Sequence, residues 1–198
     1  MPSKNLVREY DVPAFYHVYN RGAGKQKIFL DSQDKHKFMS LLKRHLLPPG
    51  NDGKEEYPIY EAEVVAFCLM GNHFHLLLYQ AVDSQAISGL MKSVATAYTM
   101  YFNRRHKASG HLFQGPFRAS RIKDESYLAH ISRYIHLNPR TYRTYYWSSL
   151  KYYLGQDTTE LVHPERVLDM TPERYMEFLE QYENRRDELK LLYSELAL

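Results

Sequence analysis

The stretch that most constrains the fold runs from Val64 to Tyr79 and reads VVAFCLMGNHFHLLLY. Two short apolar runs flank Gly71-Asn72, a dipeptide that favours a tight turn. Runs of this length on either side of a turn predict two buried antiparallel strands rather than one helix. Side chains alternate along a strand, so His73 and His75 share one face and Phe74 points to the other.

Two imidazoles at such same-face positions can bind one divalent metal ion. The alternative is that both histidines only line a half-polar face of the sheet. The His-x-His spacing alone does not discriminate between the two interpretations. The evidence that decides between them has to come from the other segments of the chain.

Composition and charge indicate one compact domain with an appendage. Of the 198 residues, 44% are hydrophobic and 25% are charged, which suits a single globular unit. The overall charge of +3 combines a net +8 over residues 1–150 with a net −5 over residues 151–198. A basic body and an acidic tail predict a polyanion-binding domain and a segment that packs on it or restrains it. Uneven surface charge without a ligand is the alternative.

The N-terminal residues, the apolar runs and the cysteine content indicate where in the cell the protein is expected. The first ten residues are polar and charged, unlike a signal peptide, and no apolar run approaches the roughly 20 residues of a membrane span. Cys68 is the only cysteine, which excludes a disulfide framework within the chain. We therefore expect a cytoplasmic protein without a membrane partner.

Hydrophobic periodicity predicts the elements around the central strands. They are a strand over 15–20, a helix from a cap at Asp31 or Ser32 to about Leu47 before the stop signals of residues 48–53, a helix after a cap at Asp83 or Ser84 to about Phe102, and a strand over 118–122. The order strand, helix, strand, strand, helix, strand describes a ferredoxin-like sandwich. This α+β fold has an antiparallel sheet with helices on one face.

A third helix carries a row of polar side chains. Asp124 or Ser126 is expected to cap its start, and a proline at position 139 ends it with Asn138 in the last turn. Beside its apolar stripe, at spacings of i, i+4 and i+8, lie His130, Tyr134 and Asn138. This row is either a solvent edge or a set of groups that face a metal held by the histidines.

The segment from Asn103 to Phe117 mixes basic and aromatic residues, and a glycine-containing basic loop follows the first strand. Basic side chains contact phosphates and aromatic rings stack on unpaired bases, so the mixture suits single-stranded nucleic acid. The residues expected to contact DNA are Arg21, Lys25, Arg104, Arg105, Lys107, His111, Phe113, Gln114, Arg118 and Arg133.

Residues 141–198 are expected to form an aromatic and helical extension that packs on a domain of residues 1–140. The tyrosine-rich run around Trp147 suits either a packing flap or a stacking surface. Thr171 before Pro172 predicts a helix start, and apolar periodicity continues towards Leu196. We expect the acidic extension to restrain DNA binding, and a structural brace is the alternative.

Three motifs in register resemble one family. GNHFHL at 71–76 is similar to the HUH motif of single-tyrosine transposases, and YTMYFNRRHKASGHLFQGPF at 98–117 and RYIHLNP at 133–139 resemble the same proteins in the same order. WSSLKYYLG at 147–155 is typical of the REP-associated tyrosine transposases, bacterial relatives of insertion-sequence transposases. The likeness covers roughly residues 12–155. It departs at Pro116, where relatives often carry a basic residue.

The resemblance implies an enzyme that cuts and rejoins single-stranded DNA. Tyr134 takes the place of the nucleophile, His73 and His75 those of metal ligands, and Asn138 that of a third ligand for Mg²⁺ or Mn²⁺. A tyrosine hydroxyl, with a reference pKa of about 10, is a poor nucleophile at neutral pH and needs such an ion. The implied product is a 5′-phosphotyrosine with a free 3′-OH. The implied substrate is a hairpin-forming palindromic repeat, which would place the protein at the nucleoid.

Two other function classes remain open. A metal-dependent phosphohydrolase would use the two histidines with water, although no extra Asp/Glu cluster accompanies them. A non-catalytic ferredoxin-like regulator would bind nucleic acid without cutting it. Walker-type loops, GxSxG, HExxH and CxxC motifs are absent. The sequence leaves monomer and homodimer open, because insertion-sequence relatives exchange the tyrosine helix between subunits.

Overall fold

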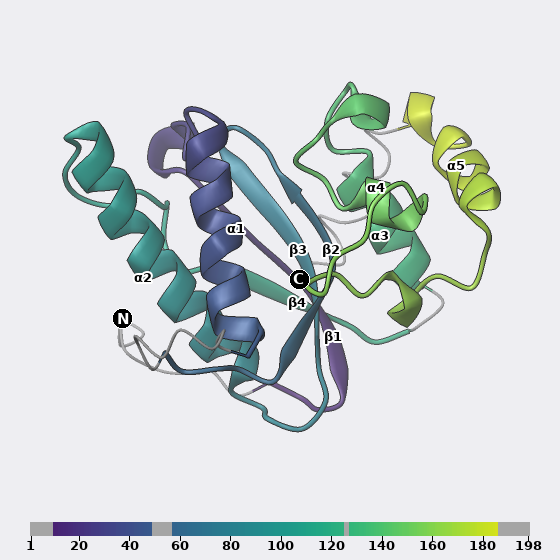
Figure 1. Cartoon of the computed structure of the whole chain (residues 1–198), viewed down its shortest axis with the longest axis horizontal. Coiled ribbons are helices and arrows are strands. Elements are labelled where there is room, and N and C mark those ends of the chain that lie inside the picture. Colours follow the sequence, from purple (N-terminus) through teal and green to yellow (C-terminus); the bar gives the residue numbers. More distant parts are fainter. Residues whose placement is uncertain (1–9, 49–56, 125–126, 186–198) are drawn as a thin grey trace.

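A four-stranded antiparallel sheet separates two groups of helices in the computed structural model, which describes residues 10–48, 57–124 and 127–185 (Figure 1). The strands lie in the order β2 (Ala62–Leu69), β3 (His73–Gln80), β1 (Ala14–Arg21) and β4 (Arg118–Ile122). Helices α1 (Ser32–Leu46) and α2 (Ala86–His106) cover one face, and α3 (Leu128–His136), α4 (Leu150–Tyr153) and α5 (Pro172–Glu180) lie on the other. This is the order of a ferredoxin-like sandwich, and it confirms the predicted α+β fold.

The face under α1 and α2 is a conventional apolar core. The even-numbered side chains of β3, such as Phe74, point into it and meet Phe38 of α1 and Tyr98 of α2. All three are at most 1% exposed. The Tyr98 hydroxyl donates a hydrogen bond to the Ile28 carbonyl at 2.6 Å, so its polar end is satisfied.

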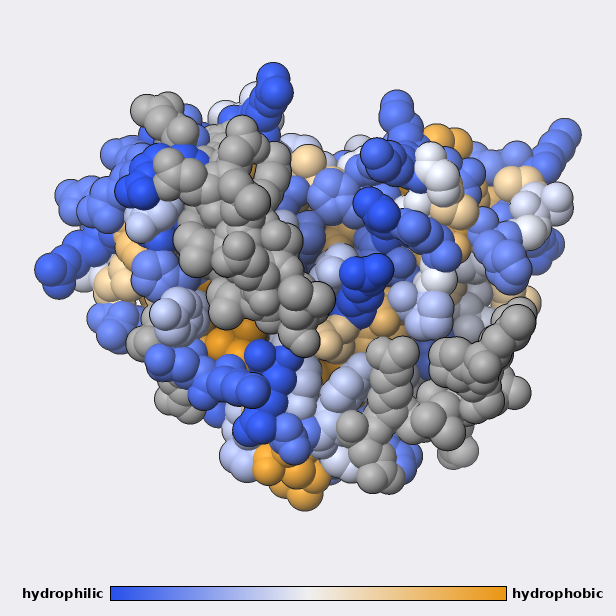
Figure 2. All heavy atoms as spheres, turned by 180° about the vertical axis from the view of Figure 1, so that it is seen from behind, coloured by the Kyte–Doolittle hydropathy of each residue, from blue (hydrophilic) through white to orange (hydrophobic). Residues whose placement is uncertain are grey.

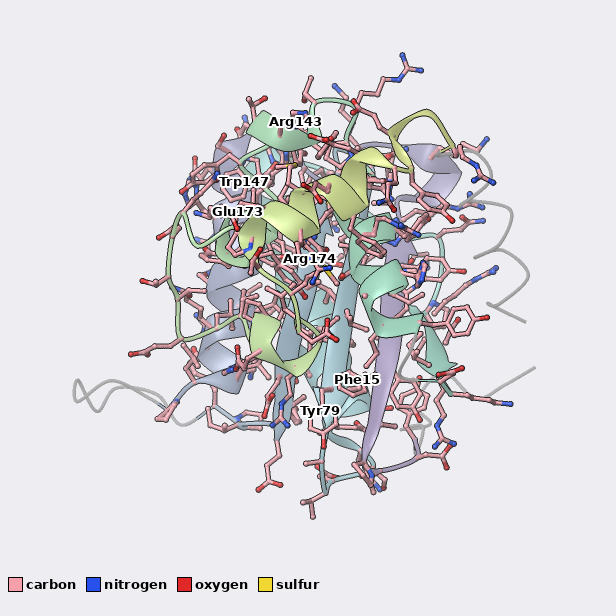
Figure 3. The ribbon with its side chains drawn as sticks, turned by 90° about the vertical axis from the view of Figure 1, so that its right-hand side faces the viewer. Phe15, Tyr79, Arg143, Trp147, Glu173 and Arg174 are labelled. Carbon is pink, nitrogen blue, oxygen red and sulfur yellow. The ribbon has the colours of Figure 1, made fainter. Side chains whose placement is uncertain are left out.

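The opposite face is covered by α3 and by the C-terminal part of the chain. Apolar residues of α3 pack on β2 and β3, and α5 packs on α3 with Tyr175 and Leu179 fully buried. Figure 3 shows α5 as the outermost helix on this side, with exposed Glu173 and Arg174. Short 3-10 helices complete the described part at Ala23–Lys25, Tyr142–Thr144, Pro164–Arg166 and Glu183–Arg185.

The segment that contains Trp147 closes the outer edge of β2. The Leu69 N–H donates to the Trp147 carbonyl and the Ser149 N–H donates to the Phe67 carbonyl, at 2.9 and 3.0 Å. These bonds satisfy edge groups of β2 that would otherwise need water. Of the two interpretations left open for this run, a packing flap or a stacking surface, these backbone hydrogen bonds support the packing flap.

Several predicted helix boundaries change. Asp31 caps α1 as expected, by accepting the Asp34 N–H at 3.1 Å. Helix α2 begins after Gln85 instead of Asp83 or Ser84, because Asp83 caps the turn before the helix by accepting the Gln85 N–H. Helix α5 begins at its Thr171 cap but ends at Glu180, well before Leu196.

Parts of these predictions lie outside the described residues. They are the alternative cap Ser126, the stop signals at 49–53 and the helical periodicity beyond residue 185. Within the described ranges, no helix combines the length and apolar character that a membrane span requires. Seen from behind, the described surface is mostly hydrophilic, with smaller apolar patches between the polar side chains (Figure 2).

Candidate active site

The two histidines and the tyrosine meet on the face of the sheet that α3 covers. His75 lies 5.4 Å from Tyr134, measured between ring centroids, with the rings nearly perpendicular. His73 reaches the end of the same helix, where its Nε2 is 3.0 Å from Oδ1 of Asn138. The structure therefore brings together all four residues that the resemblance assigns to catalysis and metal binding.

Asn138 reaches the site from just beyond the helix. Helix α3 ends at His136, so Asn138 lies in the following turn and not in the last helical turn as expected. The proline at position 139 accounts for this, because it disfavours helical geometry at the residue before it. The position after the helix directs the Asn138 carboxamide back towards His73.

Tyr134 is held in a largely buried position. Burial raises the pKa of its hydroxyl above the ordinary value of 10.0, and a hydrogen bond with the Asn138 side chain counteracts part of this rise. The hydroxyl is therefore protonated at neutral pH. It becomes a competent nucleophile only where a cation or a base offsets the charge of the phenolate.

The surroundings of His73 fit a metal ligand. Its Nδ1 lies 2.7 Å from Oδ1 of Asn72, and its Nε2 lies 3.0 Å from Oδ1 of Asn138. A neutral imidazole has one N–H, so it can donate to only one of these two oxygens. If Nδ1 donates to Asn72, the lone pair of Nε2 faces the oxygen of Asn138. A cation bound by both atoms relieves that repulsion.

The donor set suits Mg²⁺ or Mn²⁺. The imidazole nitrogen of His73 and the amide oxygen of Asn138 lie 3.0 Å apart, within hydrogen-bond distance, and both are donor types that these ions can accept. Within the described ranges, no three His, Cys, Asp or Glu side chains form a metal-binding group, and the amide oxygen of Asn138 is the further donor beside His73.

His17 is the site residue that the sequence analysis missed. It lies on β1 with 6% exposure, and its Nε2 is 2.9 Å from Nδ1 of His75 while the two rings stack at 5.1 Å. Burial lowers the pKa of His17 to about 4, and it lowers the pKa of His75 well below the ordinary value. Both rings are therefore neutral at pH 7, as metal coordination by His75 requires.

A signal for His17 was present in the alternation of FYHVYN, which places His17 and Tyr19 on one face of a strand. The strand order was needed as well, because β1 pairs with β3 only in the folded sheet. Residues far apart in the chain, such as His17 and His75, become neighbours through that pairing.

Most of the residues expected to bind DNA are exposed. They are Arg21, Lys25, Arg104, Lys107, His111, Gln114 and Arg118. Arg105 is engaged within the protein, since its guanidinium pairs with Asp31 at 2.6 Å and with Asp34 at 2.5 Å. Those two ion pairs join the end of α2 to the start of α1.

Phe113 and Arg133 do not fit the expected role. Phe113 packs against Phe74 in the core under α1 and α2, so it offers no ring to a base. Arg133 is 1% exposed and lies between the rings of Phe178 and Tyr182, at 3.9 and 3.5 Å from their centroids. Its guanidinium holds the C-terminal part of the chain against α3 instead of contacting a surface-bound strand.

His130 departs from the predicted polar row as well. Its Nδ1 lies 2.6 Å from Nη2 of Arg133, and its ring packs edge-on against Phe178. Of this row, only Tyr134 and Asn138 face the histidines of β3. His130 belongs to the contact between α3 and α5.

Two histidines on a central strand and a tyrosine on a helix packed across them form the arrangement that the motif resemblance implied. Residues 54–138 match the family described as "Transposase IS200 like", a range that contains β2, β3, α2, β4, α3 and Asn138. This match confirms the resemblance inferred from the motifs.

The likeness extends to solved structures. A REP-associated tyrosine transposase bound to a REP hairpin is 14% identical in sequence, with a TM-score of 0.54. The aligned part covers 86% of this chain and 96% of that chain, which shows a shared fold. No protein with a curated description is significantly similar to the chain.

Proposed function

We propose that the protein cuts and rejoins single-stranded DNA, with Tyr134 as the nucleophile. The observation that carries the proposal is the approach of Tyr134 and Asn138 to both histidines of β3 within one chain. The match of residues 54–138 to the IS200-like transposases supports it. The REP hairpin in the similar solved structure supports a hairpin-forming strand as substrate.

The cleavage step follows from the position of Tyr134. Its hydroxyl loses a proton while its oxygen bonds to phosphorus, and the bond from phosphorus to the 3′ oxygen breaks. The 3′ oxygen takes up a proton, so the products are a 5′-phosphotyrosine and a free 3′-OH. A Mg²⁺ or Mn²⁺ ion bound by His73, His75 and Asn138 would polarise a phosphoryl oxygen and offset developing negative charge.

Tyr134 and the same metal-binding residues can also carry out the reverse of the cleavage step. The intermediate is still a phosphodiester, with the Tyr134 oxygen in place of the 3′ oxygen. A 3′-OH that enters the site can therefore bond to phosphorus and give up its proton, while the bond from phosphorus to the Tyr134 oxygen breaks and the tyrosine regains a proton. No external energy source is required, because one phosphoester replaces another. This reversibility is what a strand-transfer reaction needs.

The active unit that we propose is a monomer. The contact between Tyr134 and His75 within one chain supports this proposal, because it requires no exchange of α3 between subunits. Buried Tyr175 and the rings around Arg133 connect α3 to the C-terminal part of the chain and hold the helix in place. Release of α3 to a partner would break these contacts.

The decisive experiment is incubation with hairpin-containing single-stranded DNA and Mn²⁺, followed by a denaturing gel. We expect a covalent protein–DNA adduct that disappears in Tyr134→Phe. Tyr127→Phe is the matched control, because it removes an exposed hydroxyl at the start of the same helix and should leave the adduct unchanged. Cleavage that persists in Tyr134→Phe would favour the phosphohydrolase, and DNA binding without any cleavage would favour the regulator.

A further inference from the structure

A pocket of about 370 Å³ opens beside the candidate active site, at the end of β1. Its volume falls in the range of small-molecule sites. The residues that line it and carry the argument are Tyr19, Asn20, Arg21, Gln114, Pro116 and Arg118.

Two rows of side chains connect this pocket to the metal-ligand histidines. In the first, His75, Tyr19 and Arg118 lie directly opposite one another on β3, β1 and β4. In the second, His73 lies opposite Arg21. Directly opposite residues point to the same face, and neighbouring strands are about 4.8 Å apart. The pocket therefore lies one to two strand spacings from the histidines, on the same face.

The two arginines of the pocket differ from most others in the protein. The arginines that form ion pairs within the described ranges are Arg105, Arg121, Arg143 and Arg166, and neither Arg21 nor Arg118 is among them. Their positive charge is thus not compensated by a carboxylate in that part of the chain. Guanidinium groups bind phosphate oxygens through paired hydrogen bonds, so two of them beside one pocket favour a phosphate.

The walls of the pocket are fixed before any ligand arrives. The Gln114 N–H donates to the Arg21 carbonyl at 2.9 Å, and the Asn20 side chain donates to the Gly115 carbonyl at 3.0 Å. Asn20 is 8% exposed and also accepts the Arg21 N–H, at 2.9 Å. A site held this way loses little conformational entropy when it binds a ligand.

The remaining walls suit a base and a sugar. Arg21 Nε donates to the Gln114 side-chain oxygen, which leaves the Gln114 amide group able to donate to a base edge. One side of the Tyr19 ring stacks near His17 and His75, at 5.4 and 5.9 Å between centroids, while the residue is only half-buried. Pro116 adds an apolar surface.

We propose that this pocket binds the nucleotide next to the scissile phosphate of the single strand. Arg21 and Arg118 hold its phosphate, and Tyr19, Gln114 and Pro116 surround its base and sugar. The inference rests on the proposed function for the identity of the strand. It adds a defined nucleotide subsite that positions the scissile phosphate between Tyr134 and the metal ligands.

Binding can be measured apart from catalysis. In EDTA, with Tyr134→Phe as the parent protein, the probe is a fluorescein-labelled dT12 strand followed by fluorescence anisotropy. We expect Arg21→Gln and Arg118→Gln each to weaken binding at least 10-fold at low salt, the loss expected for one charge-assisted phosphate contact. The slope of log affinity against log salt should fall by about 0.7 in each variant.

Arg121→Gln is the matched control. Arg121 lies three residues from Arg118 on β4, opposite Tyr16 and therefore on the other face, and it pairs with Asp11. It should change the affinity less than 3-fold. Equal losses in Arg121→Gln and Arg118→Gln, or no loss in Arg21→Gln and Arg118→Gln, would overturn the proposal in favour of diffuse electrostatic attraction.

Mononucleotides test whether the site takes a whole nucleotide. Thymidine 5′-monophosphate should shift the amide resonances of residues 19–21 and 114–118 in the ¹⁵N-labelled Tyr134→Phe protein, and inorganic phosphate should bind at least 10-fold more weakly. Equal binding of both would reduce the site to a phosphate-ion site and overturn the nucleotide assignment. If these tests succeed while the wild type never forms an adduct, the proposed function fails and the pocket stands.

Discussion

Replacing His17 should weaken metal binding without touching a metal ligand. The Nε2 of His17 lies 2.9 Å from Nδ1 of His75, and both rings are neutral and buried. With His17 as acceptor, His75 carries its proton on Nδ1 and presents the lone pair of Nε2. His17→Phe keeps a ring of similar size but removes the acceptor, so His75 loses the bond that orients it.

The size of the effect follows from that single hydrogen bond. Loss of an outer partner of a ligating histidine typically lowers metal affinity 10- to 100-fold, which corresponds to about 1.4 to 2.7 kcal/mol. The buried Nδ1 group left without its partner should also cost about 1 to 3 kcal/mol of folding free energy. His17→Gln, whose side-chain oxygen can accept from His75, should recover part of both losses.

The assay is Mn²⁺ binding followed by electron paramagnetic resonance in the absence of DNA, with thermal melting of the same samples. His36→Gln is the control, because His36 is exposed, its hydrogen bond goes to the Ser32 carbonyl, and its ring contacts Trp147 instead of His75. Wild-type Mn²⁺ affinity in a folded His17→Phe protein would refute the reasoning. Equal losses in His17→Phe and His17→Gln would point to packing of the ring instead of the hydrogen bond.

Three further outcomes are expected. His75→Ala should abolish Mn²⁺-dependent cleavage and lower the melting temperature only modestly. A melting temperature far below that of the wild type, with normal Mn²⁺ binding by the folded variant, would instead assign His75 to the core. Asp34→Asn should lower the free energy of unfolding by roughly 2 kcal/mol, because it breaks the ion pair with Arg105. Burial raises the pKa of Asp34, yet hydrogen bonds from His106 and Arg105 hold it below its ordinary value. This contribution is therefore present above pH 3.8 and lost as the pH falls through the lower folded pKa. The difference in unfolding free energy between the two proteins, measured by chemical denaturation from pH 7 downwards, should therefore shrink once the pH falls below 3.8. Deleting residues 171–198 should lower the melting temperature and solubility and leave DNA affinity within 3-fold, whereas a clear rise in affinity would restore the acidic tail as a restraint.

The expected result of deleting residues 171–198 is the reverse of what charge alone predicted, namely that the acidic extension restrains DNA binding. The sequence favoured restraint because the tail is acidic, but charge does not show which side chains of a helix are buried. Tyr175 lies fully buried, where its hydroxyl meets Ser132 at 2.8 Å and His136 at 2.7 Å. These bonds and the enclosed Arg133 make α5 a brace for the tyrosine helix.

Local patterns predicted the strands, their turn and the shared face of His73 and His75, because alternation and turn chemistry act over a few residues. The family motifs then selected Tyr134 and Asn138. Positions that depend on tertiary packing were beyond such patterns. Phe113 lies in a basic, aromatic loop whose composition predicts a DNA-binding surface, yet its ring is buried in the core. The sequence around Arg133 predicts an exposed cation, but α5 covers this side chain in the folded protein.

The Trp147 segment closes the outer edge of β2, and this limits where copies of the protein could associate through their sheets. Among the described strands, β4 is left as the sheet edge to which a foreign strand could add. It is five residues long and carries Arg118 and Arg121, two charges that oppose strand addition and edge-to-edge aggregation. Neutralising both arginines would therefore remove a safeguard against aggregation as well as a ligand contact, and light scattering of the double variant would detect it.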